Sequence, residues 1–195
     1  MAKKKEKIFE IDEILDFLKK KQSEKRFHHT LGVAYTATAL AMCHGEDLKS
    51  AEIAGLLHDV AKPLSDEEEL DFCKDNNLEI SEIEKRNPFL LHGKIGSFMA
   101  EEKFGIDDKN ILNAICNHTT GRPGMSLLEK IIYIADYIEP SRKIQPNLDE
   151  IRKLAFRNID KALIWILKDT LEYLENKGGA IDPMTQRTYD YYCLK

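Results

Sequence analysis

Cysteine is scarce and scattered in this chain. Cys43, Cys73, Cys116 and Cys193 are the four cysteines among 195 residues, and no two of them form a Cys-x-x-Cys pair. A chain of this length can bury a core without covalent cross-links, so we expect neither a disulfide framework nor a cysteine-based zinc site. The pattern is typical of a protein in a reducing compartment, and we predict a cytoplasmic location.

Long apolar runs and an excess of positive charge are also lacking. No segment reaches the roughly 20 apolar residues that a membrane span needs, and the basic start at residues 1–5 is not expected to be a signal peptide because no apolar stretch follows it. The formal net charge is −5, whereas general nucleic-acid binders usually carry a strong basic excess. We therefore expect no membrane and no nucleic acid as partner. A small phosphorylated ligand stays compatible, because a local basic pocket suffices to bind it.

Alternating apolar and polar residues, internal repeats and Gly/Ser-rich linkers are absent as well. Helical spacing of apolar residues, with capping boxes such as Ser65-x-x-Glu68 and stop signals such as Gly45, predicts an all-α fold of about nine or ten helices. The main predicted helices cover residues 24–44, 48–60, 90–104, 108–118, 127–139 and 161–177. We predict one domain over residues 1–195, with a core at about 24–140 and with helices in 8–22 and 148–192 packed on it.

The chain does contain polar residues that can bind a metal ion, in segments that are otherwise apolar. His58-Asp59 ends an apolar helical run, and Asp136 interrupts the apolar residues 131–138. Burying an unpaired polar group costs several kcal/mol, so such residues must be paired or coordinated. His29, His92 and His118 are further candidate ligands. His28 and His29 point about 100° apart on a helix, so only one of them can face inward, and periodicity does not decide which.

A mixed set of histidine and aspartate ligands favours iron, manganese, cobalt or zinc over magnesium alone. Such an ion lowers the pKa of a bound water to near 7, which provides a nucleophile for phosphoester hydrolysis. Lys62, Arg122 and Arg142 lie close to these residues in the sequence and could neutralise phosphate oxygens. For each of these cations alone, a solvated surface position is an equally good interpretation.

The order His29 … His58-Asp59 … Asp136 resembles the HD-domain metal-dependent phosphohydrolase superfamily, which has an all-α core. The segments around these residues, together with Leu91-His92-Gly93 and residues 118–123, resemble more closely the bacterial YqeK-type family of symmetrical bis(5′-nucleosyl)-tetraphosphatases. That family splits diadenosine tetraphosphate into two ADP. The resemblance therefore implies a nucleotide substrate and a metal-activated water.

The resemblance also implies a role for individual residues. It assigns the metal, taken to be iron with manganese, cobalt, magnesium or zinc as alternatives, to His29, His58, Asp59 and Asp136. It implies that catalysis involves His58, Asp59 and Lys62. It implies nucleotide contacts, or a second metal at the two histidines, for Gly32, Lys62, His92, His118, Thr119, Arg142 and the segment Gly179, Ala180, Ile181, Asp182, Pro183, Met184 and Thr185. Arg122 lies in a loop of the family pattern and is carried as a phosphate contact.

Three alternatives stay open at this point. The first alternative is another activity of the HD superfamily, such as that of a nucleotidase, a deoxynucleoside triphosphatase, a cyclic-dinucleotide phosphodiesterase or a guanosine-tetraphosphate hydrolase. The chain lacks a Gly-Tyr-Pro tripeptide, which counts against the cyclic di-GMP branch. A non-catalytic nucleotide sensor and a plain helical scaffold are the others. The aromatic tail, with Tyr189, Tyr191, Tyr192 and Leu194, could cover the core or form the interface of a homodimer.

Overall fold

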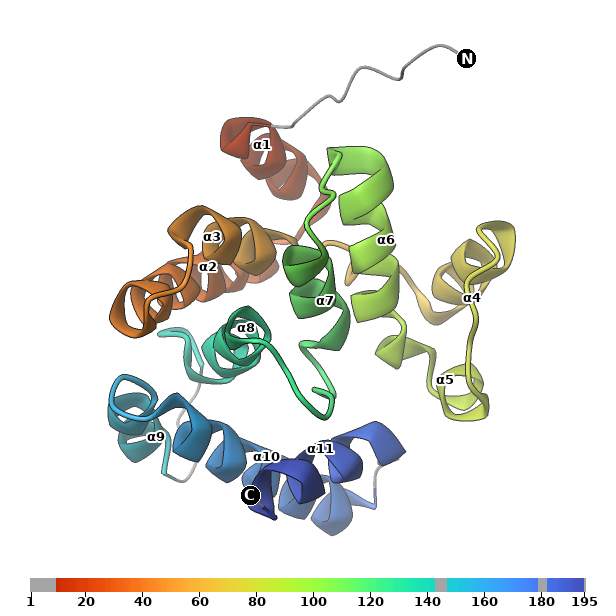
Figure 1. Cartoon of the computed structure of the whole chain (residues 1–195). Helices are drawn as coiled ribbons and strands as arrows, with labels where there is room; N and C mark the ends of the chain where they lie inside the picture. The colour runs from red at the N-terminus through yellow and green to blue at the C-terminus, as the bar shows by residue number, and fades with distance from the viewer. Residues whose placement is uncertain (1–9, 143–146, 179–181, 195) are drawn as a thin grey trace.

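The computed structural model describes residues 10–142, 147–178 and 182–194, and all regular structure within them is helical (Figure 1). The described helices are α1 Ile11–Lys21, α2 Glu24–His44, α3 Leu48–Leu57, α4 Asp66–Asp75, α5 Glu82–Arg86, the 3-10 helix η1 Pro88–Leu90, α6 His92–Phe104, α7 Lys109–Asn117, α8 Leu127–Ile138, α9 Leu148–Ala155, α10 Ile159–Lys177 and α11 Pro183–Cys193. The predicted all-α class is confirmed, with slightly more helices than expected.

Helix α8 lies at the centre of the molecule (Figure 1). Its residues are apolar on nearly every side, and a helix of that kind is stable only when neighbours cover it all round. Three helices that precede α8 in the sequence, α2, α3 and α7, pack on it, and so do two that follow it, α9 and α10. Its isoleucines at 131, 132 and 134 are fully buried. The centre of the core is therefore the segment that Asp136 interrupts.

Most helix ends lie where the local sequence predicts them. Helix α2 begins after Ser23, whose side chain accepts a hydrogen bond from the Arg26 backbone. It ends at Gly45, which adopts a left-handed conformation with φ of 80°. The predicted capping box Ser65-x-x-Glu68 is present at α4. Such caps satisfy the free N–H and C=O groups of a helix end without help from distant residues, and sequence therefore reveals them.

Helix α3 is shorter than predicted, because it ends at Leu57 rather than near residue 60. The ring Nδ1 of His58 donates to the carbonyl of Gly55 at 2.7 Å. In a continuing helix that carbonyl would accept the N–H of Asp59. Residues 58–64 instead form turns with bonds such as Val60 N to Leu57 O. His58 and Asp59 are thus displayed at a helix end.

The remaining parts of the chain frame this core. Helix α4 packs on α6 and η1, and α5 packs on η1. A second, small apolar cluster in this part of the molecule includes Ala61, Cys73, Leu91 and Ile95. In the aromatic tail, Tyr192 belongs to the main core. The four cysteines are free, as expected. No helix in the described part of the chain is long and apolar enough to cross a membrane.

Candidate metal centre

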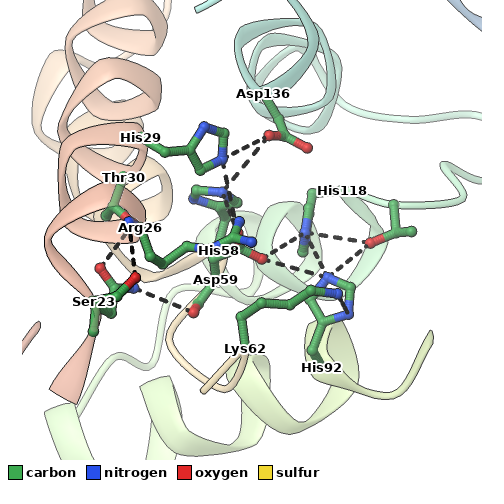
Figure 2. A network of polar contacts seen from close by, with 12 residues as sticks. Ser23, Arg26, His29, Thr30, His58, Asp59, Lys62, His92, His118 and Asp136 are labelled. Atoms are coloured by element: carbon green, nitrogen blue, oxygen red, sulfur yellow. Dashed lines mark hydrogen bonds and ion pairs between the residues drawn. The ribbon is translucent and has the colours of Figure 1, made fainter. Parts of the chain in front are cut away.

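The six predicted ligand residues come together from five parts of the chain (Figure 2). They are His29 from α2, His58 and Asp59 from the turn after α3, His92 from the start of α6, His118 from the end of α7 and Asp136 from α8. The four histidines and Asp59 are buried, whereas the Asp136 side chain is 24% exposed. The structure thus brings the six predicted residues together, although Asp136 is more open to solvent than predicted, and their role as metal ligands stays a prediction. His28 is exposed and His29 faces inward, which answers the question that periodicity left open.

The first group of ligand atoms belongs to His29, His58, Asp59 and Asp136. His29 Nε2 lies 3.1 Å from Asp136 Oδ1 and 3.8 Å from Asp59 Oδ2, and His58 Nε2 lies 3.4 Å from Asp59 Oδ2 and 3.9 Å from Asp136 Oδ1. Atoms that each lie about 2.1 Å from one ion are separated by about 3.0 Å when adjacent and by about 4.2 Å when opposite. The observed separations fall inside that range.

Two of these atoms also lack another partner. The Nε2 atoms of His29 and His58 are buried and make no hydrogen bond of acceptable geometry in the described structure. Buried polar nitrogens are rarely left without a partner, because nothing then offsets the free energy that they lose when water is removed from them. A metal ion between the two rings and the two carboxylates would satisfy both, so the residues fit the ion that the fold class implies.

The second group lies on the other side of Asp59. Its Oδ1 is 3.5 Å from His92 Nε2 and 3.7 Å from His118 Nε2, and these two nitrogens are 3.1 Å apart. Thr119 Oγ1 lies 3.2 Å from the first nitrogen and 3.3 Å from the second. Asp59 thus connects the two groups, one through each of its oxygens.

Three of the four histidines are oriented by the backbone at a helix end. In each of them, Nδ1 donates to the carbonyl three residues earlier, which leaves Nε2 unprotonated and directed into the site. The pairs are His58 with Gly55 at 2.7 Å, His92 with Phe89 at 2.5 Å and His118 with Ile115 at 2.7 Å. Helix ends supply carbonyls that are free for this purpose.

His29 is oriented in a different way, by a residue that the sequence analysis missed. Its Nδ1 lies 3.0 Å from Oε1 of Glu139, which is 1% exposed. Glu139 follows Asp136 by three residues, so the two carboxylates share one face of α8. That spacing was the available signal, but an acidic residue at a helix end is more often solvated.

Burial and charge set the protonation of the site. Burial opposes ionisation of Asp59, but His58 and His118 outweigh it and hold the pKa of Asp59 well below its usual range. Burial likewise opposes ionisation of Asp136, but the neighbouring His29 ring and the charges of His58 and Arg142 outweigh it and lower the pKa of Asp136. Burial, with the charges of His118 and Lys62, lowers the pKa of His92 to about 3. Ionised carboxylates and a neutral imidazole are the forms that bind metals.

The pKa of His29 is shifted upward, in contrast to that of His92. Burial alone would lower the pKa of His29, but the nearby Asp136 carboxylate and the hydrogen bond with Glu139 raise it. A cation is therefore favoured between these carboxylates, and a metal ion can take the place of the proton on Nε2.

Three basic side chains border the site. Lys62 Nζ lies 3.2 Å from His92 Nδ1, and burial lowers the pKa of Lys62 although the charges of Asp59 and Glu69 oppose this. Because His92 Nδ1 already donates to Phe89, the Lys62 ammonium can donate to a phosphate oxygen instead. Arg142 pairs with Asp136. Arg26, which the sequence analysis did not select, pairs with Asp59 Oδ2 at 2.5 Å.

Arg122 is engaged elsewhere. Its Nε and Nη2 donate to the two oxygens of Glu129 at 2.6 and 2.7 Å. Glu129 is 1% exposed, so this bidentate pair satisfies a buried carboxylate. The phosphate contact expected of Arg122 stays a prediction.

Two cavities adjoin Thr119. One has a volume of about 200 Å³ and is lined by His118, Thr119, Tyr133, Asp136, Tyr137, Arg142, Ile166 and Thr170. The other has a volume of about 300 Å³ and is lined by Ser81, Glu84, Leu90, Lys94, Cys116, Asn117, Thr119, Thr120, Asp182 and Met184. A ligand that extends from the histidines has room on both sides of this threonine.

The predicted nucleotide segment is only partly described. Gly179, Ala180 and Ile181 lie outside the described residues. Asp182 and Met184 line the larger cavity beside Thr119, and Pro183 begins α11. Thr185 is 3% exposed. Gly32, another predicted nucleotide contact, lies against the Glu139 carboxylate.

A buried cluster of histidines and aspartates at the centre of a helical core defines a metal-dependent hydrolase of the HD class, and the HD domain family matches residues 26–141. The chain is 42% identical to "Bis(5'-nucleosyl)-tetraphosphatase, symmetrical" of Bacillus subtilis, over 92% of this chain and 96% of that protein. It is 40% identical to the protein of the same name from Halalkalibacterium halodurans, over 93% and 96%. The chain therefore belongs to the HD-domain family, in the branch of the symmetrical bis(5′-nucleosyl)-tetraphosphatases.

A solved structure agrees with this placement. The crystal structure of a "predicted HD superfamily hydrolase involved in NAD metabolism" from Clostridium acetobutylicum matches with a TM-score of 0.92 and 44% identity. The match covers 96% of this chain and 98% of that one. The fold of the described residues is thus the fold of that hydrolase.

Proposed function

We propose that this protein hydrolyses diadenosine tetraphosphate, and related dinucleoside polyphosphates, symmetrically to two nucleoside diphosphates. The observation that carries the proposal is the complete His29, His58, Asp59 and Asp136 cluster in a chain that matches named symmetrical tetraphosphatases over more than nine-tenths of its length. The relatives indicate the substrate and the bond that is cleaved. The cluster supplies the chemistry.

We propose iron as the metal at the first group, with manganese, cobalt, magnesium or zinc as substitutes. When bound, such an ion lowers the pKa of a water molecule and polarises a phosphoryl oxygen. Asp59 and Asp136 provide ionised carboxylates, and the ring orientation of His58 presents Nε2. Lys62 and Arg142 offset the negative charge of the polyphosphate as it approaches the two carboxylates.

We further propose that His92 and His118 share a second cation. Their Nε2 atoms are 3.1 Å apart, close to the separation of about 3.0 Å between adjacent ligands of one ion. Two unprotonated nitrogens at this distance repel each other unless a cation or a proton lies between them. Metal analysis of the purified protein tests this proposal, because it predicts two ions per chain, and one ion per chain would leave direct phosphate binding as the role of the two histidines.

The cavities on the two sides of Thr119 support a substrate with two nucleoside halves. Their linings differ, with Tyr133 and Tyr137 on one side and Lys94 and Met184 on the other. The nucleotide contacts predicted at Thr119, Arg142 and residues 179–185 are part of the proposal.

The test combines product identification with two substitutions. The metal-loaded protein is incubated with diadenosine tetraphosphate, and the products are separated by chromatography. We expect ADP as the product, and we expect His58→Ala and Asp136→Ala to lose metal and at least about 10³-fold in turnover, because each removes a ligand of the activating ion. Their helical circular dichroism should stay unchanged.

His28→Ala is the matched control, because His28 is adjacent to a ligand yet exposed. It should retain both metal and activity. Formation of ATP and AMP, or full activity in either ligand variant, would contradict the proposal.

The same assay separates the alternatives. Turnover of nucleoside monophosphates, deoxynucleoside triphosphates, cyclic dinucleotides or guanosine tetraphosphate in preference to the dinucleotide would indicate another HD activity. Tight nucleotide binding by the metal-loaded protein without turnover would indicate a sensor.

A further inference from the structure

His29 needs an acceptor from outside its own helix. It lies in the first half of α2, where backbone carbonyls already accept the N–H groups one turn later. The other three histidines lie at helix ends and use a carbonyl three residues back. A mid-helix ligand has no such carbonyl, so its orientation depends on a side chain.

Glu139 meets this need as a carboxylate. Its Oε1 lies 3.0 Å from His29 Nδ1 and accepts the Ser141 hydroxyl at 2.6 Å, and its Oε2 accepts the Ser141 backbone N–H at 2.6 Å. Three donors thus converge on two acceptor atoms. An amide offers one acceptor and one donor, so a glutamine in this place would oppose either the Ser141 backbone or the His29 ring.

Gly32 provides the space for this carboxylate. It follows His29 by three residues and lies on the same face of α2. A Cβ at position 32 would lie 2.5 Å from Glu139 Oε2 and 3.3 Å from its Cδ. Real side chains do not approach so closely, so any larger residue would displace the carboxylate.

The backbone of Glu139 is fixed from the opposite side. Arg152 of α9 donates to the carbonyl of Ile138 at 2.9 Å and to the carbonyl of Glu139 at 3.1 Å. With the backbone held in this way, the contacts of the carboxylate with His29 and Ser141 oppose a move of the Glu139 side chain away from an added methyl group at position 32.

We propose that Gly32 and Glu139 act together as a positioning pair for the metal ligand His29. Glu139 holds the Nδ1–H of His29 so that Nε2 points at the metal, and Gly32 leaves the room that the carboxylate occupies. This inference rests on the proposed metal site. It also gives Gly32 a role that differs from the expected nucleotide contact.

The test measures metal affinity in the full-length protein without using activity. Metal-free protein is titrated with Co²⁺ in competition with a chelator, and the visible absorption of the bound ion is recorded. We expect Glu139→Gln to weaken Co²⁺ binding by about 10- to 100-fold, the usual effect of losing the carboxylate behind a ligating histidine. Gly32→Ala should weaken it in the same direction and change the absorption in the same way.

The double variant shows whether the two residues act together. If Gly32 only makes room for the carboxylate, adding Gly32→Ala to Glu139→Gln should produce no further loss of Co²⁺ affinity, because there is no longer a carboxylate to place. Ser141→Ala is the matched control. It removes one donor and keeps the carboxylate, so Co²⁺ affinity should stay close to that of the unaltered protein.

Three results would overturn the inference. One is full Co²⁺ affinity in Glu139→Gln, and another is additive loss in the double variant. The third is a Gly32→Ala protein that binds Co²⁺ normally but binds ADP weakly, which would make Gly32 a nucleotide contact. If Glu139→Gln unfolds below the assay temperature, Glu139→Asp replaces it. The aspartate keeps the charge but withdraws the carboxylate from His29, so the same loss of Co²⁺ affinity is expected.

These titrations measure metal binding alone, so they give a result even if the protein does not cleave diadenosine tetraphosphate.

Discussion

At the scale of single residues, Asp59 shows how one carboxylate serves two groups of ligands. Oδ2 faces His29, His58 and the guanidinium of Arg26, and Oδ1 faces His92 and His118. The ion pair with Arg26 and the rings of His58 and His118 keep the Asp59 carboxylate ionised, although this residue is only 4% exposed. The loss of Asp59 would therefore affect both groups.

Glu69 is a buried carboxyl group outside this cluster. It is 2% exposed, and its Oε2 has no hydrogen-bond partner among the residues that the structure describes. Burial raises the pKa of Glu69 from 4.5 to about 7, with the charge of Lys62 opposing this and that of Asp66 adding to it. Between these two pH values the unfolded chain loses the proton that the folded chain keeps, so the folded state is stabilised less as the pH rises.

We predict that Glu69→Gln raises the melting temperature of the metal-free protein at pH 8 but changes it little at pH 4.5. The amide removes the cost of a buried charge, which is at most about 3 kcal/mol for a shift of this size. Thermal unfolding across this pH range measures it. Glu67→Gln, on the exposed side of the same helix, is the control and should show no such gain, and an equal gain at both pH values would contradict the assignment to ionisation.

At the scale of elements, the end of α8 depends on a neighbouring helix. The last carbonyls of a helix have no partner within it. Those of Ile138 and Glu139 receive the guanidinium of Arg152 from α9. The guanidinium of Arg152 therefore links the end of α8 directly to α9. Residues 143–146, which connect the two helices in sequence, lie outside the described part of the chain.

We predict that Arg152→Met lowers the free energy of unfolding by about 1–3 kcal/mol, because it leaves two carbonyls without their charged donor while keeping the aliphatic stem. Urea unfolding of the metal-free protein measures the change. Lys153→Met on the exposed side of the same helix should change it by less than about 0.5 kcal/mol. Equal effects of the two substitutions would show that the guanidinium contact contributes nothing.

At the scale of the whole molecule, the site joins residues that are far apart in the chain. His29 and Glu139 are separated by 110 positions, and the six candidate ligands come from α2, the turn after α3, α6, the end of α7 and α8. Because the unfolded chain cannot hold these groups together, a metal ion binds the folded state preferentially and stabilises it.

We predict that metal raises the melting temperature by about 5–10 °C when its free concentration is about 100 times the dissociation constant. This follows from a stabilisation of about 2.7 kcal/mol in a protein of this size. Thermal scans with metal and with a chelator measure it. His58→Ala should show a smaller shift, because it removes a ligand of the first group, and a metal-induced shift of full size in that variant would place the binding site elsewhere.

The sequence by itself determined the helical class, most helix ends and which residues are the candidate ligands. Caps such as Ser23 and Gly45 and the apolar pattern of α8 act over a few residues, so they are readable locally. The order of His29, His58-Asp59 and Asp136 indicated the HD class. Most predicted bounds differ from the structure by one or two residues, whereas the end of α3 was predicted three residues too late, because the His58 ring takes the carbonyl that would have continued the helix.

The tertiary structure alone decided which polar groups meet. It selected His29 over His28, placed Glu139 behind His29, paired Arg26 with Asp59 and engaged Arg122 with Glu129. These contacts join separate helices or a loop to a helix, and their partners are set by how side chains pack in three dimensions. The short-range periodicity and capping that a sequence displays contain no information about such packing, and for this reason the sequence could name the candidate ligands but not the groups that orient them.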